Sequence, residues 1–379
     1  MKAILHIGQS KTGTSALQAC LAANRACLRA QGVVYPDAAI WRLPTCLLSH
    51  NALGDAVAGR QVYPYLTVEK WVSQISAQLR APGMDRLILS AEHFFGGEPR
   101  VWDMQGEEAY FTAYCAKLVA LKQLLIRCGC DAVEAVVYLR NQQDWLRSSI
   151  AHTIRFQLLH AASDVYRDDL QYFTMVRPLL RYGALLDCWA EVFGAASIRA
   201  IPYHPTALVG GDIRRDFAER AGLRGVSFIA GGEANRTLSA EFLAVKAMLN
   251  GQARAKDAER VVIACLDSLS RRQGAGRRYP MDPAILPALR DLAEPENAHV
   301  NARYMVPGTR LELPTLIHDP TVTDAEFARA MAAFREEFAT PKYRFMYLKI
   351  RMKSWLRNRA SPAHAVLRQL ALVGRRVAG

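Results

Sequence analysis

Short runs of apolar residues, separated by longer stretches in which apolar residues recur every three or four positions, make up most of the chain. The short runs are rich in β-branched residues and are expected to form strands: 3–7, 32–36, 86–90, 133–139 and 197–203. The intervening stretches have helical spacing, as in 68–80, where Trp71, Ile75 and Leu79 share one side. This alternation predicts an α/β fold in three layers, with a mostly parallel central sheet and helices on both faces.

Further helices are predicted from the same spacing at 107–127, 179–193, 212–221, 239–249 and 258–270. We expect one large domain over 1–305 and a linker over 306–322, where Pro and Gly interrupt the pattern. Thr323 and Glu326 have the capping-box spacing that opens a helix, so 323–379 is expected to be a helical C-terminal extension.

The charge of the chain is concentrated at its C-terminal end. The formal net charge is +13, yet residues 341–379 hold ten Lys and Arg and no acidic residue. The first 340 residues therefore carry 38 basic and 35 acidic side chains and are nearly balanced. The extension is the basic part of the protein.

The first expected strand ends in a turn that concentrates hydroxyl groups around one cation. Gly8 ends the apolar run, and 11–15 follow with the sequence Lys-Thr-Gly-Thr-Ser. Apolar residues at helical spacing begin near Thr14, so this turn is expected to lead into a helix N-terminus. Unpaired N–H groups and the helix dipole favour anions there, Gly13 allows close backbone approach, and Lys11 adds a full charge. The stretch is a candidate phosphate site.

This turn differs from the nucleotide-triphosphatase P-loop, because its lysine precedes the glycine by two residues instead of following it directly. The stretch from His6 to Gln18 resembles the 5′-phosphosulfate loop of sulfotransferases that use 3′-phosphoadenosine 5′-phosphosulfate (PAPS), in their bacterial or carbohydrate-type branch. The resemblance implies that Lys11, Thr12, Gly13, Thr14 and Ser15 bind the 5′-phosphosulfate, without a metal.

A second candidate site follows the strand 133–139. Arg140 leaves that strand, and Ser148 comes eight residues later on the next expected helix. A guanidinium and a hydroxyl suit a second phosphate, and open parallel sheets bind ligands at this edge. In the family that the chain resembles, Arg and Ser at this spacing hold the 3′-phosphate. The resemblance also implies that Arg236 reaches the nucleotide.

Transfer to a hydroxyl requires a base, and the strand 86–90 ends close to two candidates. We favour Glu92 as the base, with His93 second and His50 as a weaker candidate from a loop. His6 lies inside the first strand, where a buried structural histidine is the better interpretation.

The resemblance implies sulfuryl transfer to a hydroxyl of a carbohydrate, glycolipid or related acceptor. It covers about residues 1–305, including late blocks such as 297–304. The chain departs from many relatives at His152, where they carry Gln, and this puts the identity of the acceptor in doubt. The sequence leaves the acceptor and the oligomeric state open.

Two other function classes remain as alternatives. A nucleotide-dependent phosphotransferase would need magnesium ligands, yet no apolar strand ends in Asp. A non-catalytic anion-binding protein, with the tail holding nucleic acid, would require a nucleic-acid fold that the sequence does not indicate. We therefore expect no nucleic-acid partner.

The basic extension carries an apolar stripe. Phe345, Leu348, Met352 and Trp355 are spaced as one side of a helix among Lys and Arg residues, which suits an anionic membrane surface. Packing of these residues on the enzyme is the alternative.

No apolar run reaches about 18 residues, no signal peptide precedes the first strand, and the eight cysteines lack zinc-site spacing. These features favour a cytoplasmic enzyme, peripheral on the inner face of the membrane.

Overall fold

The computed structural model describes residues 1–37, 48–60, 62, 66–97, 100–156, 166–228, 238–251, 256–274, 276–314, 316 and 319–352. The chain divides into two compact units. The first comprises residues 1–149, 168–236 and 282–317, and the second comprises 150–167, 237–281 and 318–379. This division differs from the predicted one, because 150–167 and 237–281 group with the C-terminal helices rather than with the sheet.

The first unit is built on a sheet whose five described strands are all parallel, in the order β2-β3-β1-β4-β5. The strands are β1 (Lys2–Ile7), β2 (Val33–Val34), β3 (Arg86–Ala91), β4 (Ala132–Leu139) and β5 (Ile198–Pro202). β1 is central, and only Lys2, at its start, is exposed, as expected of a strand covered on both faces. Because every strand runs the same way, the segments after β1, β3 and β4 leave from one edge.

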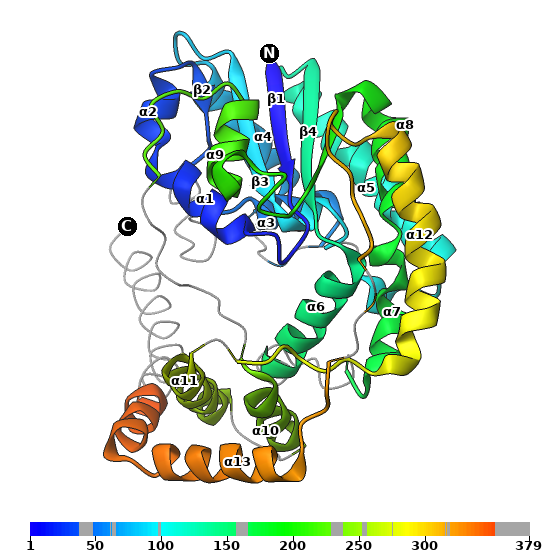
Figure 1. The fold of residues 1–379 in the computed structure, drawn as a ribbon. Coiled ribbons are helices and arrows are strands. Elements are labelled where there is room, and N and C mark those ends of the chain that lie inside the picture. The colour runs from blue at the N-terminus through cyan, green and yellow to red at the C-terminus, as the bar shows by residue number, and fades with distance from the viewer. Residues whose placement is uncertain are drawn as a thin grey trace, which may run out of the picture. The chain divides into compact units, whose positions relative to one another are not determined.

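Helices cover both faces of the sheet (Figure 1), as predicted. On one face Ile4, Ile88 and Val136 pack with Leu17 of α1 and Phe217 of α9. The helices of this unit are α1 (Thr14–Ala23), α2 (Arg25–Arg29), α3 (Asn51–Val57), α4 (Val68–Leu79), α5 (Glu107–Arg127), α7 (Asp169–Leu180), α8 (Tyr182–Phe193), α9 (Ile213–Arg220) and α12 (Leu286–Arg303). Short 3-10 turns are η3 (Glu92–Phe94), η4 (Val101–Asp103), η5 (Ala195–Ser197), η6 (Val209–Gly211) and η7 (Pro283–Ile285).

The second unit is helical in its described part. It contains α10 (Ala240–Asn250), α11 (Lys256–Gln273) and α13 (Asp324–Phe338), and 341–352 is also helical. α6 (Gln142–Phe156) begins in the first unit and ends in the second. The predicted capping box is present, since the Thr323 hydroxyl accepts from the Glu326 N–H and the Glu326 carboxylate accepts from the Thr323 N–H.

One sequence expectation needs correction. The predicted helix 179–193 is interrupted at Arg181, whose backbone is not helical, so α7 and α8 are separate. By length and composition alone, α5 is long and apolar enough to cross a membrane. In the fold, α5 packs on α8, and its residues Leu118 and Leu121 are fully buried.

Candidate functional site

The turn after β1 has an unusual backbone. Lys11 has φ +68°, a left-handed conformation that is uncommon outside glycine. Gly13 has φ +75° and is the N-cap of α1, with no side-chain cap on the helix. The Thr12 hydroxyl donates to the Gln9 carbonyl at 2.7 Å and is buried. The strain at Lys11 and the uncapped N-terminus of α1 are features of anion-binding turns.

Two glycines in this turn have no room for a side chain. A Cβ on Gly13 would lie 2.8 Å from the hydroxyl oxygen of Tyr203, which follows β5. A Cβ on Gly8 would lie 2.3 Å from the methyl group of Thr14. Burial raises the pKa of the Tyr203 phenol, and the nearby Arg140 cation opposes that shift. The turn, Tyr203 and Arg140 therefore form one compact group.

Three hydrogen bonds join the segment after β4 to the turn after β1. The Arg140 N–H donates to the Gln9 side-chain oxygen at 2.8 Å, and the Arg140 guanidinium donates to the Lys11 carbonyl at 3.4 Å. The Trp145 indole N–H donates to the Ser10 carbonyl at 3.1 Å. The structure thus brings the two predicted phosphate-binding cations, Lys11 and Arg140, to the same edge of the sheet.

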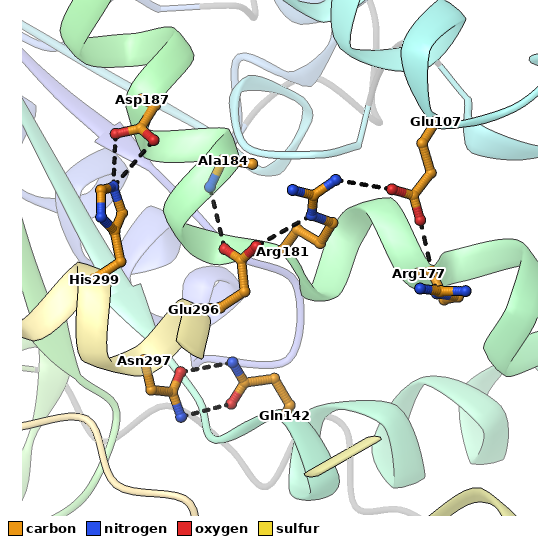
Figure 2. A network of polar contacts seen from close by, with 9 residues as sticks. All are labelled: Glu107, Gln142, Arg177, Arg181, Ala184, Asp187, Glu296, Asn297 and His299. Atoms are coloured by element: carbon orange, nitrogen blue, oxygen red, sulfur yellow. Dashed lines mark hydrogen bonds and ion pairs between the residues drawn. The ribbon is translucent and has the colours of Figure 1, made fainter. Parts of the chain in front are cut away.

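A polar network joins the start of α6, α8 and α12 (Figure 2). The buried side-chain amides of Gln142 and Asn297 exchange two hydrogen bonds, of 2.7 and 3.1 Å, which tie the start of α6 to α12. Arg181 is paired with Glu107 and Glu296. Next to it, the Tyr182 hydroxyl donates to the Arg140 carbonyl at 3.0 Å. These contacts fix the backbone that carries Arg140.

Glu92 faces the turn from the end of β3. Its carboxylate accepts a hydrogen bond from the Thr14 hydroxyl, and its own N–H donates to the Asn51 side chain at 2.8 Å. His93 turns to a different partner, since its Nδ1 lies 2.9 Å from the Asp55 carboxylate. The His93 side chain is 30% exposed and that of Asp55 is 7% exposed. Of these two candidates, Glu92 contacts the predicted phosphosulfate loop directly.

The other two histidines are structural elements of the core. His50 accepts a hydrogen bond from the Ser90 N–H on Nδ1 at 3.0 Å, and burial lowers its pKa to about 4. His6 shares a 2.7 Å hydrogen bond with the Ser90 hydroxyl, and burial lowers its pKa to about 3. Both side chains are at most 1% exposed, so neither presents a nitrogen to an acceptor at the surface.

The remaining predicted residues are more peripheral. Ser15 is exposed on α1, and Ser148 and His152 are half-buried on α6. Arg236 lies outside the described residues. Within the described part of the chain, no three His, Cys, Asp or Glu side chains gather as metal ligands would.

Sequence reasoning missed the residues that connect these groups. Gln9, Trp145, Asn51 and Asp55 each make contacts between segments that are far apart in the chain. The only available signal was proximity, since Gln9 precedes Lys11 by two residues and Trp145 lies between Arg140 and Ser148.

Comparisons with known proteins were sparse. No protein-family model matches the chain, and no curated protein matches it. The structure is similar to a crystal structure of a sulfotransferase from Alicyclobacillus acidocaldarius, with 12% sequence identity and a TM-score of 0.35. That match covers 79% of this chain and 94% of the other. At this identity and TM-score it carries no argument about activity.

Proposed function

We propose that the chain is a PAPS-dependent sulfotransferase that acts on a hydroxyl of a carbohydrate, glycolipid or related acceptor. The observation that carries the proposal is the set of three hydrogen bonds between 140–145 and 9–11. They hold a lysine turn and an arginine at adjacent strand ends, β1 and β4. A donor with a phosphate at each end of its ribose needs two anion sites on one rigid support.

The residues present fit such a donor. Lys11 and the backbone N–H groups of 12–15 surround an uncapped helix N-terminus, which suits the 5′-phosphosulfate. Gly13 keeps Tyr203 close to that turn, where a larger residue would collide with it. Arg140, half-buried, offers its guanidinium to the 3′-phosphate, with Ser148 further along α6 as the hydroxyl donor. Arg236 remains in this proposal on the resemblance alone.

When bound, the donor supplies a sulfuryl group, whose sulfur bonds to the acceptor oxygen as its bond to the bridging oxygen of the 5′-phosphate breaks. Lys11 neutralises the charge that grows on that bridging oxygen, an interaction made mainly in the transition state. Glu92 accepts the proton of the acceptor hydroxyl. Its contact with the Thr14 hydroxyl supports this role, because it holds the carboxylate against the loop.

His93 is the alternative base. Its pairing with Asp55 through Nδ1 leaves Nε2 as the other ring nitrogen, an arrangement that suits a base held by a carboxylate. The acceptor class rests on the resemblance to the carbohydrate-type branch, and the half-buried His152 stands where that branch often has Gln.

The test is a transfer assay with two labelled donors, sulfur-labelled PAPS and γ-phosphate-labelled ATP with magnesium, over a panel of hydroxylated glycans and glycolipids. We expect sulfuryl transfer from PAPS. Phosphoryl transfer from ATP without sulfuryl transfer would replace the proposal by the phosphotransferase alternative.

In the same assay, Glu92→Gln should reduce turnover by about 10²–10⁴-fold, the usual contribution of a general base, while donor affinity stays nearly unchanged. Glu134→Gln is the matched control, because Glu134 lies in the first half of β4 and pairs with Lys2 and Arg199. A loss in His93→Gln with full activity in Glu92→Gln would transfer the role to His93.

A further inference from the structure

The helix 341–352 in the second unit has one side that packs and one side that does not. Tyr343 is 2% exposed and its ring stacks on Phe338, with centroids 6.4 Å apart. Met346, Tyr347 and Ile350 follow at helical spacing and are half-buried. The Tyr343 contact attaches the start of the helix to α13 of the same unit.

That other side is apolar and uncovered. Phe345, Leu348 and Met352 are 69%, 64% and 58% exposed. Their spacing of three and four residues places them in one stripe along the helix. Phe345 and Leu348 are more exposed than any other large hydrophobic residue in the described part of the chain. A contiguous exposed apolar stripe of this kind marks an interaction surface.

Cations line the stripe. Lys342, Arg344, Lys349 and Arg351 are all exposed on the same helix. From residue 341 to the end, the sequence has no Asp or Glu, and six further Lys and Arg follow Met352. The stripe is therefore an apolar band with positive charge and no compensating carboxylate on its own segment.

We infer that 341–352 docks on an anionic lipid bilayer, with Phe345, Leu348 and Met352 inserted among the acyl chains and the four cations at the phosphate level. This inference does not depend on the proposed enzymatic function. A bilayer satisfies both halves of the pattern at once, because apolar side chains enter the boundary region while Lys and Arg remain with the headgroups.

Charge argues against the other occupants. A second copy of the helix would bring two sets of cations together, and so would residues 353–379 folded back on it. A nucleic acid would pair with the cations, but phosphate contacts leave the apolar stripe without a role. Anionic lipid is the partner whose chemistry uses every exposed group on this side.

The experiment is flotation of the full chain with vesicles of phosphatidylcholine and phosphatidylglycerol, and with vesicles of phosphatidylcholine alone. We expect binding to the anionic vesicles at low salt and a decrease of at least tenfold at 0.5 M salt, because screening shortens the reach of the surface potential. Replacing the four cations by Gln should weaken binding about 10²–10³-fold, from the usual contribution of each basic residue near such a surface.

The decisive variant is Phe345→Gln, Leu348→Gln and Met352→Gln together, since Gln keeps good helix propensity. It should lose vesicle binding. The matched control replaces three exposed apolar residues elsewhere, Val119, Ile126 and Leu170, by Gln and should bind as the wild type does. Circular dichroism establishes that each variant is folded.

Three outcomes would overturn the inference. The first is a folded full chain that does not float with anionic vesicles at low salt. The second is a triple-Gln variant at 345, 348 and 352 that binds as well as the wild type. The third is a concentration-dependent dimer, or binding to a duplex oligonucleotide, that displaces the vesicles and disappears in the same variant.

Discussion

The sheet edge of the first unit and the outer side of helix 341–352 are opposite kinds of surface. At the sheet edge, polar groups from the segments after β1, β3 and β4 converge and are hydrogen-bonded to one another. Gln9 pairs with Arg140, Thr14 with Glu92, and Asp55 with His93. On the helix, apolar groups face outward with only cations beside them. The first surface is rigid and polar, and the second is apolar and uncovered.

This difference teaches how each surface selects its partner. Converging polar groups that are already hydrogen-bonded lose little entropy on binding and discriminate by geometry, as a small anionic ligand requires. An apolar stripe with exposed cations discriminates only by polarity and charge, as a bilayer requires. Variants should therefore affect one surface and leave the other unchanged.

Lys11→Ala is expected to give the largest difference between the effects on turnover and on vesicle binding. Turnover should fall by about 10²-fold or more, the usual effect of losing one group that stabilises transition-state charge. Alanine also has a Cβ, so the left-handed backbone at this position is not relieved. Vesicle binding should be unchanged. Initial rates with PAPS and a responsive acceptor measure the effect.

The matched control is Lys2→Ala, at the other end of the same strand, where the side chain pairs with Glu134. It should retain full turnover. Equal turnover of folded Lys11→Ala and wild type would remove Lys11 from the chemistry.

Lowering the pH should reduce the stability of the fold without changing vesicle binding, and this effect is smaller than that of Lys11→Ala. Burial lowers the pKa of His6 to about 3 and of His50 to about 4, below the usual 6.5. The unfolded chain therefore binds more protons than the folded chain below pH 6.5. The free energy of unfolding falls as pH drops from about 6.5 towards 4, by about 1.4 kcal/mol per pH unit for each histidine.

Urea unfolding at pH 7 and pH 5 measures this loss, about 2 kcal/mol for each histidine at pH 5. Helix 341–352 contains no histidine, so vesicle binding should be the same at both pH values. His50→Asn should reduce the pH slope by about one proton. A slope that stays unchanged in this variant would contradict the buried neutral state of His50.

Much of the fold could be predicted from the sequence. The strands at 3–7, 86–90 and 133–139 are mostly apolar runs, and each is a strand within one residue of the expected bounds. The division into units could not be predicted, because it depends on long-range packing such as α10 on α13. The buried ion pair of Lys246 with Glu259, at 2.5 Å, likewise joins residues that look like solvated helix positions.

The sequence allowed the convergence of the candidate residues at one sheet edge to be predicted. Lys11, Arg140 and Glu92 each follow a strand, and a parallel sheet brings them to one edge. The different surroundings of Glu92 and His93 could not be predicted, because the sequence does not show that Thr14 contacts one and Asp55 the other.

The central claim is that Arg140 and the Lys11 turn bind the two phosphates of one nucleotide. Calorimetric titration tests it most directly, with 3′-phosphoadenosine 5′-phosphate, adenosine 5′-phosphate, and ATP with magnesium each added to wild type, to Arg140→Ala and to a control, Arg199→Ala. Arg140→Ala should weaken binding of the 3′-phosphorylated ligand by about 2–5 kcal/mol, as loss of a paired charge does, and leave binding of adenosine 5′-phosphate nearly unaffected. Equal weakening of both ligands, or tighter binding of ATP with magnesium than of either, would contradict the account.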